Sequence, residues 1–252
     1  MRRRISRPVF AIFMATVLAS STQAQGLEPE RGVFGGLGAP DPYELALRDA
    51  LLGAHSYRQC QLLAAPSFET EYAVYFVREK DDSATVVSRA FASQLWARLT
   101  TELERASKEP GSFRLDAASK RAALRRMRMP PVQMRRAHLD AGTAALLSGI
   151  CRDVLLQVRY PKEPSAGLDG TSYHAAHWEP GLVLSGTTWS PEDDTLAGEF
   201  VAMELALKGF ADAPEAMREA RKLELLERAK RVAKRLADGG VHAPHPRLGG
   251  SE

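Results

Sequence analysis

Residues 60–91, CQLLAAPSFETEYAVYFVREKDDSATVVSRAF, decide the fold of this chain. In residues 60–64, apolar side chains recur at the two-residue period of a strand, and a proline soon follows. Residues 72–77 are apolar on both faces, which favours a strand in the middle of a sheet. Turn-forming residues at 80–83 then join this strand to a returning one over 85–91. The stretch therefore predicts a three-stranded antiparallel meander.

A second hairpin is predicted further along the chain. The turn residues of 168–171 lead into a strand over 172–178, and Glu-Pro-Gly at 179–181 leads into another over 182–189. With helices around them, the meander and this hairpin predict a single α+β domain over residues 41–212. We expect an antiparallel sheet of about five strands that is covered by helices mainly on one face.

Helices are predicted where apolar residues recur at helical spacing between capping residues and prolines. One of them begins at Ser190, which stands as an N-cap in the order Ser-Pro-Glu-Asp. The last, over 213–238, is long and charged, and Gly239 stands at its C-terminal end. The C-terminal end of the helix around 139–156 is equally compatible with a strand. The expected helices span about 42–55, 93–109, 117–129, 139–156, 190–209 and 213–238.

Residues 1–24 have the order of a secretory signal peptide, with four arginines, an apolar run over 9–18 and then small or polar residues. The run is shorter than the roughly 20 residues of a membrane-spanning helix, and no later stretch is long and uncharged enough to span a membrane. We expect cleavage before Gln25 and export of a soluble protein to a bacterial periplasm or the extracellular space. Glycine and proline make 25–40 a predicted flexible leader, and 239–252 is a predicted disordered tail.

The distribution of charge along the chain says more about possible partners than the net charge does. Residues 1–24 hold four of the 34 Lys and Arg, so the rest of the chain has 30 basic residues against 31 acidic ones. The basic pI of the whole chain therefore gives no support for nucleic-acid binding. Basic residues gather over 114–136, where Asp116 is the only acidic one. Acidic residues are in excess over 137–212, so the two zones could simply complement each other across the surface. The candidate binding residues are Arg121, Arg125, Arg126, Arg128, Arg135 and Arg136.

The two cysteines of the chain, Cys60 and Cys151, are predicted to form a disulfide in an oxidising compartment. The alternative is a pair of separate buried thiols, because sequence does not give the distance between them. A catalytic thiol is not favoured, since neither cysteine has an evident activating neighbour.

Other residues with metal-binding or catalytic chemistry have ordinary structural explanations. His174 and His177, three apart on a predicted strand, point to opposite faces of the sheet and are badly placed to share an ion. His242 and His245 lie in the predicted tail. The pair Asp193–Asp194 lies at a predicted helix start, where the helix dipole favours acids without any catalysis. We expect no metal site and no cofactor.

These observations favour a non-catalytic binding protein of the cell envelope. Its basic cluster would hold another envelope protein or an anionic polymer. The alternative is an envelope hydrolase whose site the sequence does not reveal. It is the weaker hypothesis because an enzyme of this size usually shows at least one recoverable motif.

Overall fold

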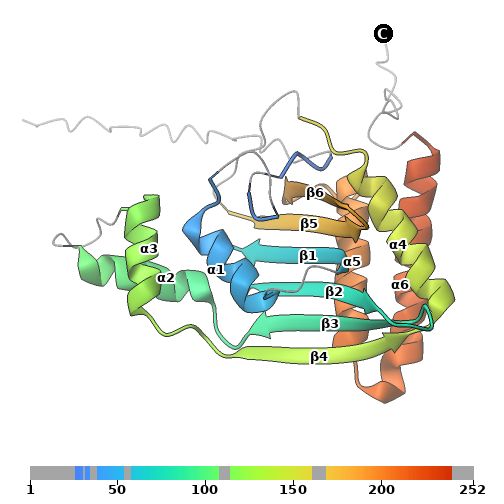
Figure 1. Cartoon of the computed structure of the whole chain (residues 1–252), viewed down its shortest axis with the longest axis horizontal. Helices are drawn as coiled ribbons and strands as arrows, with labels where there is room; N and C mark the ends of the chain where they lie inside the picture. Colours follow the sequence, from blue (N-terminus) through green and yellow to red (C-terminus); the bar gives the residue numbers. More distant parts are fainter. Residues whose placement is uncertain are drawn as a thin grey trace, which may run out of the picture.

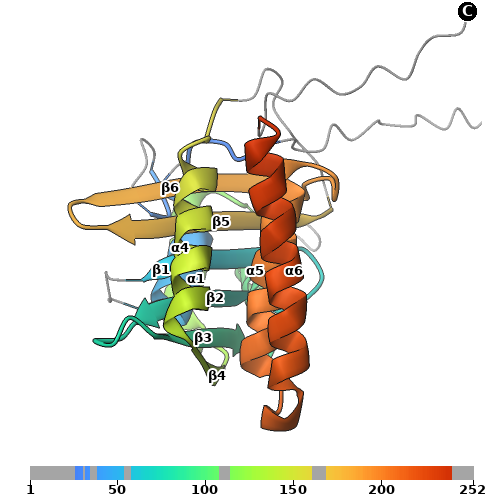
Figure 2. The same cartoon turned by 90° about the vertical axis from the view of Figure 1, so that its right-hand side faces the viewer.

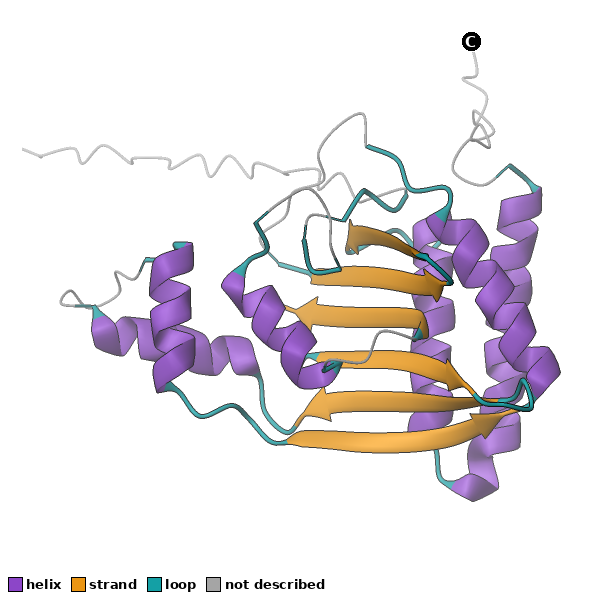
Figure 3. Ribbon diagram, in the orientation of Figure 1, coloured by secondary structure: helices purple, strands orange, loops and turns teal. Residues whose placement is uncertain are grey.

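The computed structural model describes residues 26–30, 32–34, 39–53, 58–107, 114–160 and 169–239. The predicted signal peptide, 1–24, and almost all of the predicted tail, from residue 240 onward, lie outside these described residues. The described residues confirm the predicted α+β class, with one antiparallel sheet packed between helices (Figure 1 and Figure 3).

The sheet has six strands in the order β4-β3-β2-β1-β5-β6, and each strand is antiparallel to its neighbours. The predicted meander is confirmed as β1-β2-β3, and the predicted hairpin is confirmed as β5-β6, which pairs with β1. The strands are β1 (Gln59–Pro66), β2 (Tyr72–Arg78), β3 (Ala84–Phe91), β4 (Val132–Leu139), β5 (Thr171–Glu179) and β6 (Leu182–Trp189).

The expectation of about five strands was too low, because β4 pairs with the free side of β3 and adds a sixth. Only Ala137 and Leu139 of β4 are buried, so its sequence lacks the alternation of apolar and polar residues that reveals a strand. The following helix begins at Ala141, with Asp140 as its N-cap, and remains helical to Leu155, which excludes the strand considered for its C-terminal end.

The helices are α1 (Pro42–Leu51), α2 (Leu95–Ala106), α3 (Ala117–Arg126), α4 (Ala141–Leu155), α5 (Leu196–Asp212), the short 3-10 turn η1 (Glu215–Met217) and α6 (Arg218–Ala237). The start predicted for α5 was wrong, because Thr195 and not Ser190 is its N-cap. Ser190 has a positive φ, and its hydroxyl accepts a hydrogen bond from the N–H of Thr171, so it holds the open end of the β5-β6 hairpin.

Helices cover both faces of the sheet, which corrects the expectation of cover mainly on one face. Figure 2 shows α4, α5 and α6 together on one side, where they share a core with residues such as Leu62 and Val74. Their sequence neighbours Leu63 and Tyr75 point to the other face and share a second core with α1, α2 and α3. Successive residues of a strand face opposite sides, so strands that are apolar at both positions require cover on both.

The segment 25–40 packs against the sheet where the structure describes it. Leu27 and Val33 are buried. The N–H of Glu28 donates to the carbonyl of Thr187 on β6 (2.7 Å), and the N–H of Thr187 donates back to the carbonyl of Glu28 (2.8 Å). This packing covers part of the β6 edge.

The predicted disulfide is confirmed, and it joins Cys60 of β1 to Cys151 of α4. Both residues are fully buried in the core that α4, α5 and α6 form with the sheet. The bond therefore ties a strand to a covering helix across the apolar layer between them.

Candidate functional site

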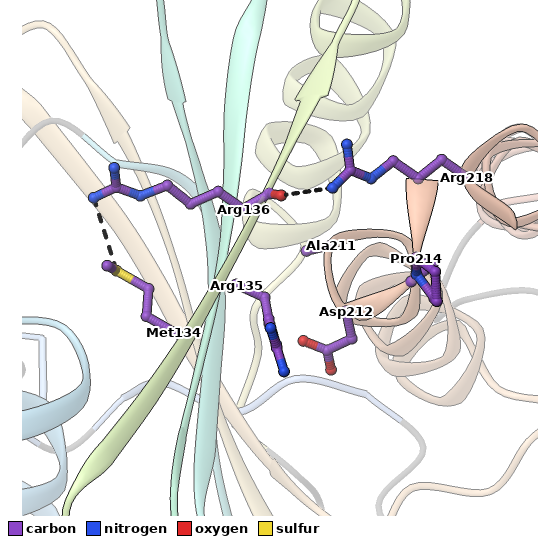
Figure 4. A pocket seen from close by; sticks show the side chains of 8 residues that line it. Met134, Arg135, Arg136, Ala211, Asp212, Pro214 and Arg218 are labelled. Carbon is purple, nitrogen blue, oxygen red and sulfur yellow. Dashed lines mark hydrogen bonds between the residues drawn. The ribbon is translucent and has the colours of Figure 1, made fainter. Parts of the chain in front are cut away.

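The most distinctive surface lies along the outer edge of β4. A hollow of about 580 Å³ opens there between the strand and the end of α5 (Figure 4). We call it the β4 groove. It is lined by Met134, Arg135 and Arg136 of β4, by Asp212 at the end of α5, by Pro214 just after it, and by Arg218 at the start of α6.

The two arginines of β4 extend to opposite sides of the strand. Arg135 shares a face with the buried Ala137 and Leu139, and in Figure 4 it extends on the side of Asp212. Arg136 extends to the other side, as Met134 does, and its guanidinium approaches the Met134 sulfur at 3.8 Å. The alternation of side chains along a strand thus places positive charge above and below the edge.

The main chain of β4 also faces the groove. The carbonyl of Arg136 accepts a hydrogen bond from the Arg218 guanidinium (3.3 Å), so it points away from β3. The carbonyl of Pro131 points the other way, because it accepts from the N–H of Ala92 beside β3. In an antiparallel pair the N–H and C=O of one residue point to the same side and alternate along the strand. The N–H groups of Met134 and Arg136 therefore point outward, and neither donates to a described residue.

Positive charge dominates the β4 groove. Its three arginines face one carboxylate, Asp212, whose Oδ2 already accepts from the ammonium of Lys208 at 2.6 Å. The ion pair of Arg218 with Glu215 is long, at 4.0 Å, and the Glu215 side chain is almost fully exposed. Long exposed pairs contribute little. The groove can thus attract an anionic group without breaking a strong internal ion pair.

A second basic groove, of about 610 Å³, lies between α2 and the C-terminal end of α3. We call it the α2–α3 groove. Glu102 lines this groove and pairs with Arg126 at 3.0 Å and with Arg105 at 3.8 Å. A guanidinium nitrogen of Arg98 donates to the carbonyl of Arg128. Its charge is therefore partly neutralised by a carboxylate held between two arginines.

The structure divides the six candidate arginines between these surfaces. Arg126 and Arg128 line the α2–α3 groove, whereas Arg135 and Arg136 line the β4 groove. Arg121 and Arg125 are exposed on α3 and line neither groove. Sequence reasoning missed Arg218, which lies 82 residues from Arg136 and meets it only through the fold. No pattern in the sequence links the two positions.

The disulfide lies beside a buried acid. Both sulfurs and a carboxylate oxygen of Glu204 lie within 4.8 Å of one another. A metal would need deprotonated thiolates, and the disulfide leaves none. Burial raises the pKa of Glu204 well above its usual value. Its Oε1 lies 3.3 Å from the Cys151 sulfur, which an O–H of the neutral acid can approach as a donor.

The two histidines of β5 lie on opposite faces of the sheet, as predicted. His177 is fully buried, and its Nδ1 accepts from the N–H of Cys60 (3.3 Å). On the other face, the Nδ1 of His174 lies 3.1 Å from Glu30. Burial alone would raise the pKa of Glu30. The hydrogen bond with His174 and those from the backbone N–H groups of Gly32 and Phe34 outweigh burial and lower that pKa to about 2. This pair holds the N-terminal segment to the sheet.

In the described part of the chain, no helix combines the length and the apolar character needed to cross a membrane. Comparisons of the chain with known protein families, with curated proteins and with solved structures give no match. The geometry and charge of the two grooves are therefore the features from which a function can be inferred.

Proposed function

We propose that this protein is an exported, non-catalytic binding protein of the cell envelope that holds an acidic partner in the β4 groove. The supporting observation is the charge of that groove, because its described lining sets Arg135, Arg136 and Arg218 against a single carboxylate, Asp212, which is itself paired with Lys208. The α2–α3 groove fits this role less well, because Glu102 already pairs with two of its arginines.

The expected strength follows from ordinary ion-pair energies. An exposed pair contributes about 0.2–1 kcal/mol, so three arginine–carboxylate contacts would contribute up to about 3 kcal/mol, or roughly 100-fold in affinity. Reversing the charge of Arg135 and Arg136 removes two of these contacts and adds repulsion. We expect that change to weaken binding at least tenfold.

The test compares three double variants that each change the net charge equally. R135E/R136E alters the β4 groove, R126E/R128E alters the α2–α3 groove, and R121E/R125E on α3 is the matched control that alters neither. Each is titrated with a nine-residue oligoglutamate at about 0.15 M salt, where charges beyond roughly 8 Å are screened.

The proposal predicts a loss of at least tenfold for R135E/R136E and less than twofold for R121E/R125E. Equal losses in all three variants would mean that only net charge attracts the probe, and the proposal would be wrong. The same titration with a sulfated polysaccharide tests whether a polymer without a peptide main chain binds as well.

A further inference from the structure

We infer that the acidic partner is an extended polypeptide segment that pairs with β4 as a seventh strand of the sheet. This inference rests on the proposed function, because it specifies how the β4 groove holds its acidic partner. The chemistry required is that of a peptide main chain with carboxylate side chains.

The first support is the pair of outward main-chain groups. Strand addition needs alternate N–H and C=O groups that point away from the sheet. Met134 and Arg136 provide such N–H groups, and the groove opens at these residues. An added strand would lie about 4.8 Å from β4, in the space that the groove provides.

The second support is the carbonyl of Arg136, which at present accepts from Arg218 at 3.3 Å. An N–H of the added strand can replace that donor. The guanidinium of Arg218 then becomes available for a carboxylate of the same segment. Arg218 thus protects the edge of the sheet when no partner is present. When a partner is bound, the same side chain can pair with one of its carboxylates.

The third support is the placement of charge on both faces. Successive side chains of an added strand point to alternate faces of the sheet. Arg135 lies on one face of β4 and Arg136 on the other. A glutamate on either face of the added strand can therefore meet a guanidinium. A single anionic group would use only one face, whereas an acidic extended segment uses both.

The opposite edge of the sheet already shows this mode of pairing. Glu28 of the N-terminal segment exchanges two main-chain hydrogen bonds with Thr187 of the edge strand β6. No described segment does the same for β4, whose strand partner is β3 alone. Charged side chains on an edge can also serve only to prevent unwanted pairing, and the experiment must separate the two roles.

The test removes one outward N–H without removing charge. Met134→Pro deletes an N–H that is not bonded to β3, and an edge strand tolerates proline at such a position. Met134→Leu is the matched control, because it changes the side chain and keeps the N–H. Both full-length variants are titrated with the nine-residue oligoglutamate and with the same peptide N-methylated at every residue, which blocks the N–H groups of both strand edges, and their unfolding temperatures are measured.

We expect M134P to lose at least tenfold in affinity, M134L to lose less than twofold, and the N-methylated peptide to bind the unaltered protein at least tenfold more weakly. If M134P binds like M134L while R135E/R136E still abolishes binding, strand addition is wrong and the proposed function stands. If none of these variants alters binding, both are wrong.

If M134P does not fold, a second measurement on the unaltered protein tests strand addition instead. Hydrogen exchange at the N–H groups of Met134 and Arg136 is followed in the unaltered protein with and without saturating oligoglutamate. Strand addition predicts at least tenfold slower exchange at both positions in the complex, because each group acquires a hydrogen-bond partner. Unchanged exchange at both positions, with the peptide bound, would overturn the inference.

Discussion

Loss of the disulfide should lower the stability of the domain by a large part of its total. The bond joins residues that lie 91 apart in the sequence. A loop of that length corresponds to about 4–5 kcal/mol of denatured-state entropy on the chain-entropy model. The free energy of unfolding of a domain is typically about 5–15 kcal/mol, so the reduced chain should be only marginally stable. At roughly 2–4 °C per kcal/mol, the unfolding temperature should fall by about 10–20 °C.

The assay is urea unfolding with and without a dithiol reductant. Reduction keeps every side chain in place, whereas the C60A/C151A variant also removes two buried sulfurs and adds a small packing loss. Because both cysteines are buried, the reduced sample is first unfolded in the reductant and then refolded. Coincident unfolding curves for the oxidised and reduced chains would refute this reasoning, as would titration of two free thiols in the denatured, unreduced protein.

Two further predictions concern buried acids and have opposite signs. Because the pKa of Glu204 is raised in the folded protein, its contribution to the free energy of unfolding is fully present below pH 4.5 and is lost as the pH rises. The loss is about 1.4 kcal/mol per pH unit until Glu204 itself ionises in the folded protein. Glu204→Gln should therefore flatten the fall of the unfolding free energy above pH 5, and an unchanged slope would contradict this. The lowered pKa of Glu30 means that its contribution is present above pH 4.5 and is lost as the pH falls towards 2. Glu30→Gln should cost about 1–3 kcal/mol at pH 7 and little at pH 2, measured by urea unfolding at both values.

Local turn chemistry made much of the fold predictable. The turns at 80–83 and 179–181 fixed two hairpins, and the structure contains both. The disulfide was also predictable, because Cys60 and Cys151 had no other cysteine to pair with. The hairpins depend on residues that are close in the sequence, and two cysteines allow only one pairing.

The edge strand was not predictable for a physical reason. Four consecutive residues of β4, from Gln133 to Arg136, are exposed, so its sequence resembles that of a polar loop. Its pairing with β3 depends on main-chain groups that are common to all sequences. The start of α5 was misplaced because Ser190 and Thr195 are both good N-cap residues, and only the hairpin contact of Ser190 decides between them.

The candidate site was predictable in composition and not in arrangement. The arginine-rich stretch was evident, but the sequence presented it as one cluster. The chain turn at Pro130–Pro131 instead sends Arg135 and Arg136 along the sheet edge, away from α3. Arg218 completes the β4 groove from a helix that begins 82 residues after Arg136.

Mapping where an acidic peptide binds would test directly whether the β4 groove is the binding site. Backbone amide chemical shifts of the full-length protein are followed by NMR during titration with the nine-residue oligoglutamate. Binding in the β4 groove predicts that the largest changes occur at residues 132–138 and at Arg218. Changes centred on residues 94–105 and 126–128 would place binding in the α2–α3 groove and contradict it, as would small changes spread over every basic surface.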